Sequence, residues 1–127
     1  MLVPVEKLRA LAEGILTDNG VPPEHAKIQA GLFIDAQMRG IPSHGLLRLR
    51  RVIERIRVGL SVPGATGKQT WSSRNFLSVD GERGLGPVVV QAALDAIMPR
   101  AREDGIAIAA INNCNHLGAL AYYAEQV

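Results

Sequence analysis

The sequence predicts an α/β protein in which three N-terminal helices are followed by the start of a mixed sheet covered by helices. Apolar residues recur at helical spacing through the first sixty residues. Two β-favouring runs, 69–72 and 75–79, then stand at hairpin spacing, and the unbroken apolar run 106–111 has the length of a strand. We therefore expect two units, a helical segment over 1–60 and the beginning of an α/β core over 61–127.

Breaker and capping residues mark the three helices. The first helix lies between Pro4, which suits an N-terminal turn, and Gly20, which suits a left-handed end. The second helix occupies most of 22–40 and begins at Pro22 and Pro23. The third is expected over about 45–58, because Ser43 just before it is a favourable N-cap residue.

The second unit combines strands and helices. After the hairpin, a helix begins at Pro87, and we expect Pro99 to kink or end it. The run 106–111 predicts a central strand that is covered on both faces. A helical pattern over 117–127 follows and has no stop signal, so we expect the sequence to be the N-terminal part of a longer protein.

Composition narrows the class of function. The 127 residues are 47% hydrophobic and 20% charged, which suffices for one globular core. A formal net charge of +2 is too small to indicate a nucleic-acid or membrane-surface protein. The single cysteine, Cys114, excludes an internal disulfide, and no signal peptide or apolar run of about 20 residues is present. We expect a cytoplasmic protein that binds neither nucleic acid nor membranes.

The segment 39–48 carries the clearest chemical signal. His44 and Arg48 are four residues apart and would share one face at the start of the third helix, where backbone N–H groups favour an anion. Histidine exchanges protons near neutral pH, and the planar fork of an arginine binds a carboxylate. A lone histidine is often only a surface residue, but the arginine one turn away favours a functional role.

Two further arginines extend this stripe. Arg51 and Arg55 follow Arg48 at helical spacing. Such a stripe is usually a solvated helix face, and the sharper alternative is that Arg48 clamps a carboxylate. Nucleic-acid binding by a basic helix is the least favoured alternative, because Glu54 interrupts the positive face and the chain has few aromatic residues.

A polar loop over 112–118 follows the apolar run, at a place where α/β proteins collect ligands. Its His116 is a second candidate for proton transfer or carbonyl polarisation, and its amides could contact a substrate or satisfy local backbone groups. Cys114 with His116 could indicate a nucleophile or a metal site, but neither zinc spacing nor a third triad member is visible. The glycines over 81–86 match neither phosphate-binding fingerprint, so a tight turn explains them better.

Two motifs carry a resemblance to a known family, residues 39–45 and residues 113–118, and the second motif is preceded by the short segments 79–81 and 84–86. In these motifs the sequence resembles the malate/L-lactate dehydrogenase family of the second, non-Rossmann type. This family also contains ureidoglycolate, sulfolactate and diketogulonate oxidoreductases and a cyclic-imine reductase. The resemblance covers essentially the whole sequence, which corresponds to the N-terminal portion of much longer members.

The resemblance implies an enzyme that uses NAD or NADP to interconvert a 2-hydroxy acid and a 2-keto acid, usually as a homodimer. It implies catalytic roles for His44 and His116, and substrate contacts for Arg48, Ser43 and Asn115. It assigns no cofactor-binding residue and no metal. Because the family's nicotinamide-binding segment lies largely beyond residue 127, we expect this chain alone neither to bind cofactor tightly nor to turn over. The alternative is a catalytically inactive module that dimerises or binds a small carboxylate.

Overall fold

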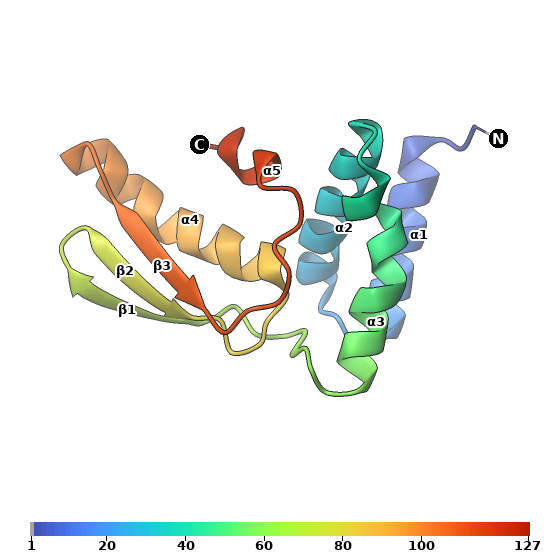
Figure 1. Ribbon diagram of the computed structural model, residues 1–127, viewed down its shortest axis with the longest axis horizontal. Helices are drawn as coiled ribbons and strands as arrows, with labels where there is room; N and C mark the ends of the chain where they lie inside the picture. The colour runs from blue at the N-terminus through green and yellow to red at the C-terminus, as the bar shows by residue number, and fades with distance from the viewer. Residues whose placement is uncertain (1) are drawn as a thin grey trace.

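The structure, a computed structural model, describes residues 2–127 and has the predicted mixed α/β architecture (Figure 1). Three helices pack together, and beside them lies a three-stranded sheet with α4 against one face. The elements in chain order are α1 (Val5–Asp18), α2 (Pro23–Met38), the 3₁₀ turns η1 (Pro42–His44) and η2 (Leu46–Arg48), α3 (Leu49–Arg57), β1 (Lys68–Ser73), β2 (Phe76–Asp80), α4 (Gly86–Asp104), β3 (Ile108–Asn112) and α5 (Ala121–Ala124).

The first two helices form where the sequence predicts them. Leu16 of α1 and Ala30 of α2 are completely buried in a shared apolar core, and Gly20 ends the α1 segment with a left-handed φ of 87°. Leu85 and Val88, from the start of α4, belong to the same core. The two predicted units therefore share buried side chains, and their division at residue 60 stays a prediction.

The third helix differs from the prediction, because α3 begins only at Leu49. Gly45 adopts an extended conformation, with φ −92° and ψ −144°, between the two 3₁₀ turns. A Cβ there would lie 2.7 Å from the side-chain oxygen of Gln37, so close packing against α2 holds this backbone. Ser43 is consequently not the N-cap of an α-helix. His44 and Arg48 do not share one helix face, and the helix-terminus argument for anion binding at His44 was wrong.

The sheet has the order β1-β2-β3, with β1 antiparallel and β3 parallel to β2. Leu77 and Val79 of β2 are buried against Val89 and Ala93 of α4. The prediction of a central β3 covered on both faces was wrong, since β3 is an edge strand here and Ile108 is 50% exposed. The apolar run indicates what β3 can bury, but within residues 2–127 only β2 pairs with it and only α4 covers it.

Two helix predictions in the second unit need correction. Of the two outcomes expected at Pro99, an end to the helix is wrong, because α4 continues to Asp104 with Pro99 on its exposed side and Gly105 as a left-handed cap, whereas a kink stays a prediction. Packing of the flanking turns on the sheet outweighs the lost backbone hydrogen bond. The predicted helix over 117–127 shrinks to α5, because Gly118 has a φ of 78° and breaks the helical path. None of the helices formed by residues 2–127 combines the length and hydropathy that crossing a bilayer requires.

Candidate active site

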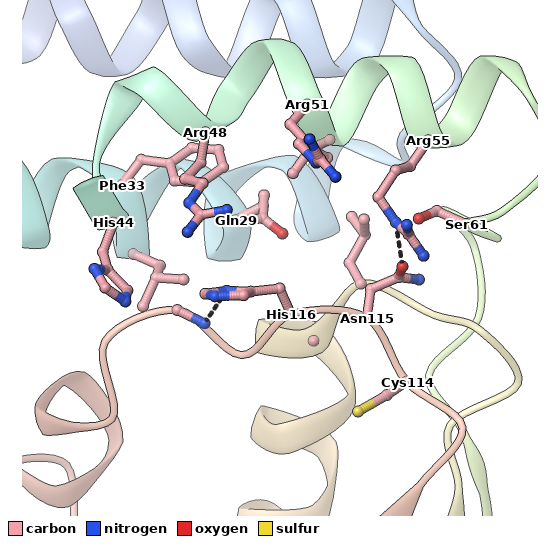
Figure 2. A pocket seen from close by; sticks show the side chains of 15 residues that line it. Gln29, Phe33, His44, Arg48, Arg51, Arg55, Ser61, Cys114, Asn115 and His116 are labelled. Carbon is pink, nitrogen blue, oxygen red and sulfur yellow. Dashed lines mark hydrogen bonds between the residues drawn. The ribbon is translucent and has the colours of Figure 1, made fainter. Parts of the chain in front are cut away.

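A cavity of about 340 Å³ lies where the helical segment meets the loop after β3 (Figure 2). Helix α2, the two 3₁₀ turns and α3 form one wall, which we call the helical wall. Residues 114–118 form the opposite wall, which we call the loop wall. The polar side chains that line the cavity are Gln29, His44, Arg48, Arg51, Arg55, Ser61, Cys114, Asn115 and His116.

Four of the five predicted site residues line this cavity. His44 and Arg48 come from the helical wall, and Asn115 and His116 from the loop wall. Ser43 does not line the cavity but lies directly behind it. Its hydroxyl is 3.1 Å from Nδ1 of His44, and its backbone carbonyl accepts a 2.7 Å hydrogen bond from Nε of Arg48. Ser43 therefore links the histidine to the arginine although no regular helix joins them.

The two histidine rings face each other across the cavity, with centroids 5.7 Å apart and planes tilted by 47°. Nδ1 of His116 accepts a 2.8 Å hydrogen bond from the backbone N–H of Gly118. A backbone N–H can only donate, so Nδ1 carries no proton and the neutral ring is protonated at Nε2. Desolvation of the ring, then the charge of Arg48, then His44, lower the pKa of His116. The local geometry thus favours a neutral His116 whose Nε2–H can donate.

Asn115 connects the loop wall to the helical wall. Its Nδ2 donates to the carbonyl oxygens of Arg83 and Gly84, at 2.6 and 3.0 Å, and its Oδ1 accepts a 2.9 Å hydrogen bond from Nε of Arg55. Both Nδ2 protons are therefore used within the protein. This arrangement holds Arg55 in place, while a direct contact between Asn115 and a substrate stays a prediction.

The glycines after β2 allow the loop wall to pack closely. A Cβ at Gly86 would lie 2.3 Å from the carbonyl oxygen of His116, and one at Gly81 would lie 2.6 Å from Cβ of Cys114. At Gly84 the nearest atom would be the carbonyl oxygen of Ala65, at 2.7 Å. Because protein atoms fill the space around this turn, it does not fit the phosphates of a dinucleotide.

The other predicted chemistries gain no support from the geometry. Burial raises the pKa of the Cys114 thiol, which favours the unreactive protonated form. Over residues 2–127, no group of three histidine, cysteine, aspartate or glutamate side chains is arranged to hold a metal ion.

Comparison with known proteins places the chain in a family. The sequence profile of the malate/L-lactate dehydrogenase family matches residues 3–127. The chain belongs to this family. It is 34% identical to L-sulfolactate dehydrogenase of Methanocaldococcus jannaschii over 98% of its length, and 37% identical to malate dehydrogenase of Pyrococcus abyssi over 96%. These alignments cover 36% and 34% of the two relatives, so the chain spans about a third of the length of the curated relatives it matches.

Solved structures of dehydrogenases share the fold of this chain. A dehydrogenase from Sinorhizobium meliloti superposes with a TM-score of 0.95 at 49% identity, covering 99% of this chain and 40% of that one. Malate dehydrogenase of Pyrococcus horikoshii also reaches 0.95, at 33% identity, with 99% and 36% covered. The family resemblance and the α/β fold class predicted from the sequence are therefore confirmed.

Sequence reasoning missed two polar residues of this cavity. Gln29 lies on α2 and is 3% exposed, and Ser61 follows α3 and is 5% exposed. A signal for Gln29 was present, because it occupies an otherwise apolar helix face between Ala26 and Phe33. Ser61 gave no such signal, since it stands in a loop where serine is common.

Proposed function

We propose that this chain carries the proton-transfer and carboxylate-binding groups of an oxidoreductase that interconverts a small 2-hydroxy acid and its 2-keto acid. The observation that carries the proposal is the placement of two imidazoles, 5.7 Å apart, on the same cavity as Arg48. The names of the relatives support it, because malate and sulfolactate are both 2-hydroxy acids.

Arg48 would bind the carboxylate next to the reacting carbon. Its Nε is used to hold the carbonyl of Ser43, and its terminal nitrogens make no hydrogen bond to any residue in 2–127. A guanidinium fixed through Nε presents its remaining N–H groups in a defined direction. A carboxylate held there would bring the neighbouring oxygen-bearing carbon toward the two histidines.

The two histidines would divide the work on that oxygen. His116, with Nδ1 occupied and Nε2–H available, would donate a hydrogen bond and polarise the C–O bond. His44, whose Nδ1 is paired with the Ser43 hydroxyl, would give a proton to the oxygen during reduction and take it back during oxidation. Ser43 would then be a positioning residue for His44 and Arg48.

A nicotinamide cofactor, NAD or NADP, would carry the hydride in this reaction. Its phosphates require a binding surface other than the turn at Gly81–Gly86, as that turn is filled by the loop wall. Assembly as a homodimer, which the family resemblance implies, is part of the same proposal.

Turnover measurements test the division of roles, in a protein of the family's full length that contains this sequence. With a 2-keto acid and NADH or NADPH, we expect His44→Ala to lower kcat by about 10²- to 10⁴-fold. His116→Gln places an N–H donor near the position of Nε2 and should retain more activity than His116→Leu. His25, whose Nδ1 is 2.9 Å from the carbonyl oxygen of Pro63, does not line the cavity, so His25→Gln is the matched control.

Two results would contradict the proposal. Undiminished turnover in His44→Ala would remove its proton-transfer role. If the unsubstituted full-length protein oxidised or reduced no 2-hydroxy or 2-keto acid with either cofactor, the inactive binding module would replace the oxidoreductase.

The protonation of His116 can be followed in the 127-residue chain itself. Because its pKa is lowered, we expect His116 to titrate below about pH 6.5, with Nδ1 unprotonated in ¹⁵N NMR spectra at neutral pH. The unfolded chain then binds more protons than the folded chain between the lowered pKa and about 6.5, so the free energy of unfolding should fall as pH drops through that interval. His116→Gln should remove this part of the pH dependence. A His116 that titrates above pH 6.5 would contradict the neutral-donor role.

A further inference from the structure

The arginines of this chain differ sharply in whether they have a carboxylate partner. Outside the cavity, Arg39, Arg50 and Arg74 bind carboxylates at 2.7, 2.8 and 2.7 Å. Within residues 2–127, no ion pair is found for another group of arginines outside the cavity, which comprises Arg57, Arg83, Arg100 and Arg102. The cavity arginines, Arg48, Arg51 and Arg55, have no carboxylate within 4.0 Å in the part of the chain that the structure describes. Three positive groups on one cavity repel each other unless a ligand supplies negative charge.

Two buried polar side chains face the same cavity. Gln29 and Ser61 are 3% and 5% exposed, both line the cavity, and no hydrogen bond of either side chain is found within residues 2–127. Within residues 2–127, Oδ1 of Asn75 is the one fully enclosed polar side-chain atom without a partner, so the polar atoms of Gln29 and Ser61 are not sealed in the protein. They are therefore available to hydrogen-bond a ligand that enters the cavity. Figure 2 shows Gln29 entering the cavity between Arg48 and Arg51, and Ser61 beside Arg55.

These unpartnered groups lie beyond the ones that the proposed reaction uses. His44, His116 and Arg48 gather at one end of the cavity, whereas Arg55 and Ser61 lie at the other, with Gln29 and Arg51 between (Figure 2). One carboxylate is satisfied by one guanidinium fork, which Arg48 provides. Arg55 is held at the far end by Asn115, at 2.9 Å, so its position is fixed before any ligand arrives.

We propose that Arg51, Arg55, Gln29 and Ser61 form a second anion subsite, so that the substrate is a dianion with an acidic group at each end. The inference rests on the proposed function and narrows its substrate class. The second group is a carboxylate or sulfonate, because its oxygens can accept hydrogen bonds from guanidinium, amide and hydroxyl donors together. A monoanionic hydroxy acid such as lactate would leave these donors without partners.

Binding to the 127-residue chain tests the subsite without requiring turnover. The ligands are L-malate, L-lactate and the C4 methyl ester of L-malate, which keeps the length of malate but removes one charge, and affinity is measured by calorimetry or NMR titration. We expect L-malate to bind at least about tenfold more tightly than the other two ligands. The ester comparison needs no substitution and therefore stands even if a variant fails to fold.

Substitutions then locate the second group. Arg55→Gln and Gln29→Leu should each weaken L-malate binding by about tenfold and change L-lactate binding by less than about twofold. Arg50→Gln, on the same helix but 89% exposed at its side chain and paired with Glu54, is the matched control and should change neither.

Three results would overturn the subsite. Equal binding of malate, lactate and ester would remove the second anionic group from the substrate. An equal loss of malate and lactate binding in Arg55→Gln would place Arg55 at the shared carboxylate. Unchanged malate binding, combined with weakened NADPH binding when the same substitutions are made in the full-length protein, would assign the subsite to a cofactor phosphate. Failure of the proposed function looks different, because a protein that prefers dianions but transfers no hydride loses only the oxidoreductase proposal.

Discussion

The two walls of the cavity reach the same pocket by different means. The helical wall presents its side chains from elements that satisfy their own backbone hydrogen bonds, chiefly α2 and α3. The loop wall has no regular structure where it lines the cavity, and Asn113, the residue just before it, holds a left-handed φ of 49°. Contacts with the turn after β2 fix it, including backbone hydrogen bonds from Asn115 to Gly84 at 3.0 Å and from Arg83 to Asn113 at 2.7 Å.

The helical wall therefore contributes side chains from a backbone that is stable by itself, whereas the backbone of the loop wall must be held in place by other residues. On the helical wall, an exposed cavity side chain can change without moving the helix that carries it. On the loop wall, the position of His116 depends on close packing against the supporting turn, for example against Gly86, which has no side chain to contact a ligand. Substitutions in the loop wall and its supporting turn should therefore affect folding and site together, and substitutions on the helical wall should affect the site alone.

The largest effect is expected for Gly86→Ala, at a position with no proposed chemical role that packs directly against the backbone of His116. The added Cβ would lie 2.3 Å from the carbonyl oxygen of His116 and 2.7 Å from that of Asn115, and both are backbone atoms that cannot rotate away. We expect the free energy of unfolding to fall by about 3 kcal/mol in urea denaturation, with a displaced His116 signal in NMR spectra. Gly64→Ala is the control, because no atom lies within 4 Å of a Cβ there. Similar free energies of unfolding for the two variants would show that the backbone of the loop wall can shift to accommodate the added Cβ at little cost.

Asn115→Ala should have the next largest effect. It removes the amide that donates to the carbonyls of Arg83 and Gly84 and accepts from Arg55, so we expect a loss of about 1 to 3 kcal/mol in the free energy of unfolding. The guanidinium of Arg55 should also become more mobile in NMR relaxation. Asn112→Ala, at the end of β3 just before this loop, is the control, because no hydrogen bond of its side chain is found in residues 2–127. An equal loss in both variants would argue against the bridging role of Asn115.

The N-terminal helices, which include α2 of the helical wall, were the part that the sequence predicted best. Helices α1 and α2 follow from strong apolar periodicity with proline and glycine at their ends, because these signals act within one turn of the chain. The start of α3 could not be predicted in the same way. Gly45 is extended because it packs against Gln37 of α2, and that contact between separate elements leaves no local signal.

The loop wall and β3 show a second limit of the sequence. Its polar composition indicated a site and singled out Asn115 and His116, which the structure places on the cavity. It could not show that Asn115 binds Arg55, sixty residues earlier in the chain. The apolar composition of β3 likewise indicates only that both faces of the strand can be buried. Which faces are buried depends on the neighbouring elements found within residues 2–127.

The smallest effect on stability is expected on the helical wall, for Arg51→Gln. Arg51 is exposed, and its side chain forms no hydrogen bond or ion pair with any of residues 2–127, so the free energy of unfolding should change by less than about 0.5 kcal/mol. Binding should still respond, because Arg51 faces the cavity, and L-malate should bind several-fold more weakly. Urea denaturation and malate titration of Arg51→Gln and Arg50→Gln measure both quantities side by side. If Arg51→Gln lost stability as Asn115→Ala does, its guanidinium would be a structural support, and the two walls would not differ in the way that their hydrogen bonds indicate.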